Sequence, residues 1–246
     1  MAVHDFNAQR LYLDAPLVPG ARIAASREQA NYLFNVLRLG PGDRLLAFNG
    51  RDGEWLGEIE QEGKKAVSLA AREQTRPQTP PGRITYLFAP LKRARLDYMV
   101  QKAVEMGVGR LCPVMTRRTV AERVNLERMR ANAIEAAEQC GILSLPAIDE
   151  PVTLPQALAR LDASLPFVFC DEAAEVANPV AALAGLPRGD VGVLVGPEGG
   201  FDPAERAAIL AHPGAVPISL GPRIMRADTA AIAALAVVNA TLGDWG

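Results

Sequence analysis

Residues 191–210 read VGVLVGPEGGFDPAERAAIL, and this stretch decides the fold. The apolar run at its start is typical of a buried strand. Asp202, Pro203 and Glu205 then predict the first turn of a helix, with a side-chain cap, a proline and an acid in the favoured positions. A strand followed by a helix is the repeating unit of a parallel sheet. Ligands of such sheets bind at the carboxyl ends of the strands, which makes the intervening loop a candidate site.

The intervening loop, GPEGG at residues 196–200, does not match the common phosphate-binding loops. No Gly-Lys-Ser or Gly-Lys-Thr follows it, and its glycines are not spaced as GxGxxG, so a phosphate-cradling role is disfavoured. Gly199 and Gly200 let the backbone turn where a side chain would collide with a ligand. Glycine-rich turns of this kind are more often structural than functional, so the loop alone does not identify a ligand.

A second strand-to-helix unit lies at residues 218–243, ISLGPRIMRADTAAIAALAVVNATLG. The chain turns at Gly221 and Pro222, and a helix is predicted from about Thr229, with Asp228 or Thr229 as its cap. Small side chains dominate this helix, so it can approach another backbone closely. We expect it to pack against its own sheet or against a second subunit.

The rest of the chain from residue 84 onward also alternates apolar strands with amphipathic helices, which indicates a parallel sheet covered on both faces. We predict strands in ITYLFAP, RLCPVM, PFVFC, VGVLV and VPISLG, and helices in ARLDYMVQKAVEMG and NLERMRANAIEAAEQC. The first of these helices carries one apolar stripe, made of Leu96, Met99, Val100, Ala103 and Val104. The pattern predicts an α/β domain over residues 84–246.

Shorter strands with tight turns come first and predict a small β-barrel over residues 1–74. The predicted strands are RLYL, residues 21–25, DRLLAFN, EWLGEIE and KAVSLAA. Ser26 and Gln29 form a capping box that begins a helix, and Gly40 is expected to end it. Prolines interrupt residues 75–83, which therefore join the two domains as a linker.

Charge is distributed unevenly along the chain of 246 residues, although the net charge is only −2. Residues 92–130 carry 10 basic and 4 acidic side chains, whereas residues 131–246 carry 5 basic and 14 acidic ones. A mildly acidic protein binds a polyanion when its cations gather on one face, because phosphate contacts depend on the local potential. The positive segment therefore favours a nucleic-acid partner, with a set of solvated helix faces as the alternative.

Cysteines and histidines limit the possible chemistry. Cys112, Cys140 and Cys170 have no metal-binding spacing and are expected to be buried, reduced thiols. His4 lies in the N-terminal segment and His212 is expected at a helix end, so neither indicates a catalytic triad or a metal centre. No apolar stretch is long enough for a transmembrane helix, and the first residues lack the pattern of a signal peptide. We therefore expect a cytoplasmic protein.

The two loops together resemble the paired C-terminal motifs of the RsmE family of SPOUT RNA methyltransferases, through GPEGGF in the first and LGPRIMRADTA in the second. The segments YLFNVLRLGPGDRL, KRARLDYMVQKAVEMGV, PVMTRRTV and EAAEQCG extend the resemblance over the whole chain, in the family's order. It implies a PUA-like RNA-binding barrel followed by an α/β domain tied in a deep trefoil knot. The implied activity is methylation of N3 of a uridine in 16S ribosomal RNA of the small subunit, with S-adenosylmethionine as methyl donor and no metal. The implied assembly is a homodimer.

Carried onto this chain, the resemblance implies a cofactor pocket formed by both loops. Its residues would be Gly196, Pro197, Glu198, Gly199, Gly200, Leu220, Gly221, Ile224, Met225, Arg226, Thr229 and Ala230. Arg226 is the candidate catalytic residue, because a cation near the uracil carbonyl oxygens would stabilise the developing anion; a phosphate or interface contact is the alternative. Asp228, Glu198 and bulk water remain open as proton acceptors. Replacing Gly199 by Val is expected to abolish cofactor binding.

Phosphates of the RNA are expected at seven cations, Arg10, Arg38, Lys92, Arg93, Arg95, Arg117 and Arg118. The dimer interface is expected to include the final helix, residues 229–242, whose apolar and small side chains cover more of its surface than one sheet can bury.

Three departures from the family pattern concern individual contacts. Ala227, Asp228 and Thr229 stand where the family usually has Thr-Glu-Thr, Ile142 stands where a basic residue is common, and Tyr32 stands where a histidine is frequent. Two alternative functions also fit the sequence: a non-catalytic RNA-binding factor with this fold, and a SPOUT enzyme that modifies transfer RNA.

Overall fold

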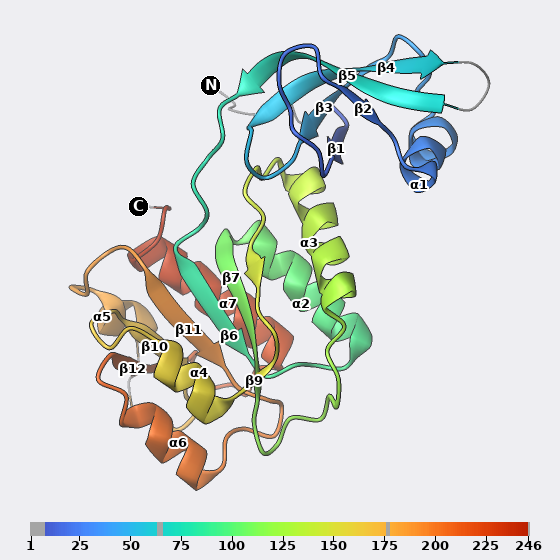
Figure 1. Cartoon of the computed structure of the whole chain (residues 1–246). Coiled ribbons are helices and arrows are strands. Elements are labelled where there is room, and N and C mark those ends of the chain that lie inside the picture. Colours follow the sequence, from blue (N-terminus) through green and yellow to red (C-terminus); the bar gives the residue numbers. More distant parts are fainter. Residues whose placement is uncertain (1–7, 63–65, 176–177, 246) are drawn as a thin grey trace. The chain divides into compact units, whose positions relative to one another are not determined.

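The computed structural model describes residues 8–62, 66–175 and 178–245 (Figure 1). The chain divides into two compact units, residues 1–80 with residues 137–145, and residues 81–136 with residues 146–246. The first unit thus takes in a short segment from far along the chain. The hydrophobic pattern of the sequence does not indicate that this segment belongs to the first unit, because the segment continues the periodicity of a helix.

The first unit contains a five-stranded sheet in the order β1-β3-β4-β5-β2. Its strands are β1 (Arg10–Tyr12), β2 (Arg22–Ala24), β3 (Arg44–Phe48), β4 (Glu54–Glu62) and β5 (Ala66–Arg76). β1 pairs with β3 in parallel, and the other neighbours are antiparallel. Apolar side chains such as Leu33, Ile59 and Leu69 form its buried core. All five predicted strands are present.

The predicted helix of the first unit begins as expected but ends early. Its two parts are α1 (Arg27–Asn31) and the π-helix η1 (Tyr32–Val36). The capping box is confirmed, since the Gln29 amide donates to Ser26 Oγ at 3.1 Å and the Ser26 amide donates to Gln29 Oε1 at 2.9 Å. The prediction that the helix continues to Gly40 is wrong. The wide π-turn unwinds it, and Arg38 has left-handed backbone with φ +57°.

A buried ionic cluster holds the ends of β4 and β5 together. Glu54 accepts from Arg10 Nε at 3.1 Å, from Arg76 Nη2 at 2.6 Å and from Thr75 Oγ1 at 2.9 Å. Burial is the largest influence on the pKa of Glu54 and raises it, but the bonds from Arg76, Thr75 and Arg10 together hold the pKa below its usual range. These bonds extend β5 to Arg76, past residue 74 where the first domain is predicted to end.

The second unit contains the parallel sheet predicted from the alternating pattern. Its strands are β6 (Ile84–Phe88), β7 (Val108–Met115), β8 (Ala147–Ile148), β9 (Val152–Thr153), β10 (Phe167–Cys170), β11 (Val191–Val195) and β12 (Ala215–Ile218). They lie in the order β12-β10-β11-β6-β7-β8, with β9 beside β7. Every pairing is parallel, so all their carboxyl ends face one edge.

Helices cover both faces of this sheet, with α2 and α7 on one face and α4 and α6 on the other (Figure 1). The helices are α2 (Arg93–Glu105), α3 (Leu126–Cys140), α4 (Leu154–Arg160), α5 (Pro179–Leu183), α6 (Pro203–Leu210) and α7 (Ala227–Thr241). The buried residues of α2 are the five of the predicted stripe. Asn125 caps α3 as expected, because its Oδ1 accepts from the Arg128 amide at 2.9 Å.

The last helix begins earlier than predicted. α7 starts at Ala227 with Arg226 as its N-cap, so neither Asp228 nor Thr229 occupies the cap position. Asp228 instead lies in the first turn, where its Oδ1 accepts from the Thr229 amide at 2.8 Å and its charge complements the helix dipole.

The elements β8, β9, α4 and α5 were not predicted. Among the described residues, none of the helices combines the length and apolar character required to span a bilayer.

Candidate functional site

A pocket of about 560 Å³ lies at the carboxyl ends of β10, β11 and β12, within the second unit. Three loops form it, and α7 closes one side. We call residues 196–202 the glycine loop, residues 219–226 the C-terminal loop and residues 171–175 the acidic loop. The pocket therefore lies at the edge of the sheet where the strand-to-helix pattern predicts a ligand.

The glycine loop owes its shape to backbone positions that exclude a side chain. A Cβ on Gly196 would lie 2.5 Å from the ring of Phe201, and this ring packs edge-on against Phe169 with centroids 5.4 Å apart. Gly200 has φ +69°, and its amide donates to Pro197 O at 2.9 Å. The loop is thus folded tightly, and a non-glycine residue at position 200 would be strained.

The start of α6 fixes the far end of the glycine loop, as predicted. The Glu205 amide donates to Asp202 Oδ1 at 2.8 Å, and the Asp202 amide donates to Glu205 Oε2 at 3.2 Å. The bond from the Glu205 amide is the largest influence on the pKa of Asp202, and with Arg117 it holds this pKa below its usual range. Asp202 therefore stays ionised near neutral pH.

The C-terminal loop is more exposed than the glycine loop. Gly221 has φ +106°, and a Cβ built on it would meet no neighbouring atom, so conformation and not space requires glycine here. Ile224 is 91% exposed, which is unusual for so large an apolar side chain. Met225 and Ala227 line the pocket on either side of the exposed Arg226.

The acidic loop contributes polar residues that the sequence analysis missed. Asp171 is 5% exposed and accepts from Arg206 Nη2 at 2.8 Å and Nε at 3.0 Å; both residues line the pocket. Glu172 faces the glycine loop, because its Oε1 lies 3.3 Å from the place of a Cβ on Gly200. A signal existed, since Asp171 directly follows the predicted strand PFVFC and so lies at the same edge of the sheet.

Nine of the twelve predicted cofactor residues line the pocket: Gly196, Pro197, Glu198, Gly200, Leu220, Gly221, Ile224, Met225 and Ala230. Three do not: Gly199, Arg226 and Thr229. Gly199 points its carbonyl out of the pocket toward Arg118, whose Nη1 donates to it at 2.7 Å. That these nine residues contact a cofactor remains a prediction.

The seven cations predicted to bind RNA fall into three groups. Arg38, Lys92 and Arg93 are exposed, and the side chains of Lys92 and Arg93 form no hydrogen bond or ion pair with another described residue. Arg95, Arg117 and Arg118 all contact the glycine loop. Arg10 is only 7% exposed and faces Glu54, so its burial argues against the contact with RNA that the sequence analysis expected.

The histidines and cysteines add little to the site. His212 lies beyond α6, where its Nδ1 accepts from the Gly214 amide at 3.2 Å, in line with the capping role; His4 lies outside the described residues. Cys140 at the end of α3 is exposed and Cys170 is half-buried, so the expectation that all three thiols are buried holds only for Cys112. Cys170 lines the pocket, and burial raises its pKa to about 12.

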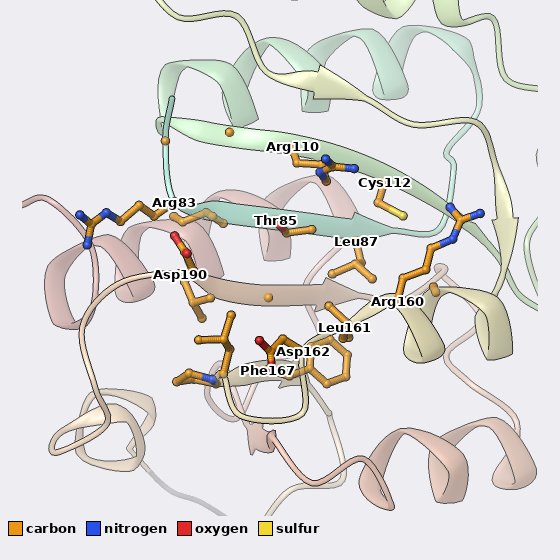
Figure 2. Close-up of a pocket in the computed structure, with 18 of the residues that line it drawn as sticks. Arg83, Thr85, Leu87, Arg110, Cys112, Arg160, Leu161, Asp162, Phe167 and Asp190 are labelled. Carbon is orange, nitrogen blue, oxygen red and sulfur yellow. The ribbon is translucent and has the colours of Figure 1, made fainter. Parts of the chain in front are cut away.

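A second pocket, of about 470 Å³, opens at the opposite edge of the same sheet, near the amino ends of β6, β7, β10 and β11 (Figure 2). Its floor is formed by strand residues such as Thr85 and Phe167, and charged side chains surround it. One of these, Arg110, donates to Asp149 at 2.9 Å. No glycine loop borders this pocket. Nowhere in the described chain do three His, Cys, Asp or Glu side chains gather as metal ligands would.

Known families match both units of the chain. The RNA methyltransferase domain family matches residues 78–239, and the RNA methyltransferase PUA domain family matches residues 26–70. The chain is 32% identical to ribosomal RNA small subunit methyltransferase E of Rickettsia conorii over 94% of each protein. It is 30% identical to the protein of the same name from Mycobacterium tuberculosis, over 97% of this chain and 94% of the relative.

Solved structures agree with these sequence relatives. The ribosomal RNA small subunit methyltransferase E from Neisseria gonorrhoeae, described as bound to S-adenosyl methionine, superposes with a TM-score of 0.81 and 25% identity over 98% of this chain and 100% of that one. A methyltransferase from Legionella pneumophila in complex with the same cofactor gives a TM-score of 0.81 and 30% identity, over 95% of this chain and 98% of that one. The similarity thus covers both units and the candidate pocket.

Proposed function

The chain belongs to the ribosomal RNA small subunit methyltransferase E family, and from this premise we propose that it transfers the methyl group of S-adenosylmethionine to N3 of a uridine in small-subunit ribosomal RNA. The observation that carries the proposal is the pocket at the carboxyl ends of β10, β11 and β12, formed by the two loops whose motifs resemble the family's. The trefoil knot and a cytoplasmic location are further expectations of the same resemblance.

The pocket fits a nucleoside-based methyl donor in size and chemistry. Its volume of about 560 Å³ lies within the range of about 300–1,000 Å³ that is usual for small-molecule sites. Its walls combine apolar side chains with residues of the glycine and C-terminal loops, and a Cβ at Gly196 or Gly200 would crowd Phe201 or Glu172, which also line the pocket. Backbone amides and carbonyls would hold the adenine and ribose, while Asp171 and Glu172 supply carboxylate acceptors.

The chemistry supplied by the bound cofactor is an electrophilic methyl group, so the protein has to orient the uracil and help its N3 lose a proton. Arg226 is the N-cap of α7 between Met225 and Ala227, which line the pocket, and its exposed side chain would be available to the uracil carbonyl oxygens. Glu198 lines the pocket and already pairs with Arg95. Asp228, half-buried in the first turn of α7, is the other carboxylate near the pocket, and bulk water is the third candidate.

RNA binding in this proposal depends on exposed cations in both units. Arg38, Lys92 and Arg93 are available to phosphates. The left-handed backbone of Arg38 is uncommon for a residue with a Cβ, and such conformations are concentrated at functional positions. Loss of one phosphate contact would reduce the slope of log affinity against log salt by about 0.7–0.9.

The proposed homodimer is supported by apolar surface beside the pocket. Leu235, Val238 and Asn239 of α7 are buried within the chain, but Ala233 and Val237 remain half-exposed, and Ile224 is exposed nearby in the sequence. We expect A233E or V237E to give folded monomers with weakened cofactor binding, measured by sedimentation and calorimetry. Folded dimers with full binding would contradict the interface.

Nucleoside mass spectrometry is the direct test of the activity. RNA from a strain that lacks the protein is incubated with the purified protein and S-adenosylmethionine, and 3-methyluridine is expected in small-subunit RNA alone. Methylation of transfer RNA would favour the alternative substrate. Calorimetry with S-adenosylmethionine separates the non-catalytic alternative, since a pure RNA-binding factor should give no heat of binding.

A further inference from the structure

Two adjacent arginines, Arg117 and Arg118, hold the glycine loop from outside the pocket. Arg118 Nη1 donates to Gly199 O at 2.7 Å, and Arg117 Nη1 donates to Asp202 Oδ2 at 2.7 Å. The Arg117 amide also donates to Glu205 Oε1 at 2.8 Å. The segment that carries both arginines therefore docks on the glycine loop and on the start of α6.

The arginine segment has a defined shape of its own. The Thr116 amide donates to Thr119 Oγ1 at 2.9 Å, and the Thr119 amide donates back to Thr116 O at 3.1 Å. These bonds close a turn with Arg117 and Arg118 at its centre. The two guanidinium groups are thus brought to the glycine loop by a structured turn that follows β7.

Neither guanidinium is saturated by these contacts. The Arg117 side chain is 72% exposed and Arg118 is also exposed, although each donates to the glycine loop. A guanidinium carries five N–H donors in a planar fork, so one edge can bind the loop while another binds a phosphate. The positive charge of this segment predicts RNA contacts for both arginines, but it does not indicate their contacts with the glycine loop.

We propose that Arg117 and Arg118 couple RNA binding to cofactor binding, by holding the glycine loop with one edge of each guanidinium and an RNA phosphate with the other. This inference rests on the proposed function. Arg117 and Arg118 act here as positioning residues, because they contact residues of the glycine loop outside the pocket and not the contents of the pocket.

The coupling is positive in sign. Fixing an arginine side chain costs up to about 2 kcal/mol of conformational entropy, and this cost arises once even when the side chain has two partners. A bound phosphate therefore makes the contacts with Gly199 O and Asp202 more favourable, and these contacts favour the folded glycine loop that the cofactor needs. Coupling energies between two sites are commonly equivalent to about 5–150-fold in affinity, and a surface contact of this kind belongs near the lower end, about tenfold.

Calorimetry with S-adenosylhomocysteine, which cannot donate a methyl group, measures the coupling. The compound is titrated into the protein alone and into the protein saturated with unmethylated small-subunit RNA, and the ratio of the two dissociation constants is the coupling factor. By thermodynamic linkage, S-adenosylhomocysteine must raise the affinity for RNA by the same factor. Filter binding of the RNA with and without the compound checks this equality.

The decisive comparison uses two double variants that each remove two positive charges. R117A/R118A removes the contacts with the glycine loop, whereas K92A/R93A removes exposed cations that make no contact with it. We expect both to weaken RNA binding, but only R117A/R118A to reduce the coupling factor from about ten to about one. R118K, which keeps a donor and the charge, should retain part of the coupling and serves if the double variant does not fold.

A native coupling factor of one, an unchanged factor in R117A/R118A, or an equal loss in both double variants would overturn the inference. Equal loss would mean that general electrostatic attraction explains the effect. Failure of the proposed function is distinguishable, because the native protein would then neither bind nor methylate small-subunit RNA. A protein that methylates this RNA without the expected difference between the variants contradicts the coupling alone.

Discussion

The two ends of the parallel sheet in the second unit carry pockets of similar size but of different construction. At the carboxyl end, loop backbone, glycines and small side chains of α7 form about 560 Å³ of space. At the amino end, side chains such as Arg83, Arg160, Asp162 and Asp190 surround about 470 Å³ (Figure 2). In a parallel sheet the strand-to-helix loops lie at the carboxyl edge, so the same strands give one end suited to a cofactor and another lined by opposing charges.

The largest effect expected from this difference follows from Gly200. Replacing it by Val places a β-branched side chain at φ +69°, which costs several kcal/mol when the strain of the left-handed region is combined with branching. The glycine loop should then leave its folded shape. We expect G200V to weaken S-adenosylhomocysteine binding about 100-fold in calorimetry, since about 2.7 kcal/mol corresponds to that factor.

G199V is the matched control, because the backbone at position 199 differs from that at position 200. Gly199 has no left-handed backbone, and a Cβ on it would meet only Arg118, at 3.6 Å. The predicted loss of cofactor binding in G199V is therefore revised to an affinity within about threefold of the native protein, because no strain is introduced. T85V at the amino-end pocket should also leave binding unchanged. Equal losses in G199V and G200V would show that the two positions do not differ as described.

Arg226 and Arg160 provide the second contrast between the two ends. Both are exposed arginines near a pocket, but only Arg226 begins α7 beside the carboxyl-end loops. Loss of a group that stabilises developing negative charge typically lowers kcat about 10²-fold. We expect R226Q to show such a loss in methyl transfer, with cofactor affinity nearly unchanged, and R160Q to retain native kcat. A normal kcat in R226Q would leave Arg226 as a phosphate or interface contact.

Regular patterns explain what the sequence could predict of this contrast. The apolar run VGVLV, the capping box at Asp202 and the glycines between them placed the carboxyl-end pocket correctly. These signals are local, because strand, turn and cap each depend on residues close in sequence. The amino-end pocket had no such signal. Its charged residues come from distant segments, and only the strand order β10-β11-β6-β7 brings them together.

Long-range contacts likewise explain the errors. The sequence showed Arg117 and Arg118 as part of a positive segment, but their hydrogen bonds join them to residues more than 80 positions away. The burial of Arg10 depends on Glu54 in a different strand. In both cases the side chain has a fixed partner that composition cannot reveal, since charge counting does not distinguish a paired cation from a free one.

The smallest effect concerns the cysteines, one at each pocket. Burial is the main cause that raises the pKa of Cys170 to about 12 at the carboxyl end and that of Cys112 to about 11 at the amino end. Because the thiolate is the reactive form, only a small fraction of either thiol is reactive at pH 8. Iodoacetamide should therefore label the exposed Cys140 first, as followed by peptide mass spectrometry.

Cofactor binding turns this labelling into a comparison of the two pockets. Cys170 lines the carboxyl-end pocket and Cys112 lines the other, so saturating S-adenosylhomocysteine should slow the labelling of Cys170 and leave that of Cys112 unchanged. Raising the pH from 8 to 9 should increase both slow rates about tenfold, because each pKa lies well above this range and the thiolate fraction grows tenfold per pH unit. Equal protection of both thiols would mean that the compound tightens the whole sheet, and protection of Cys112 alone would place the cofactor at the amino end.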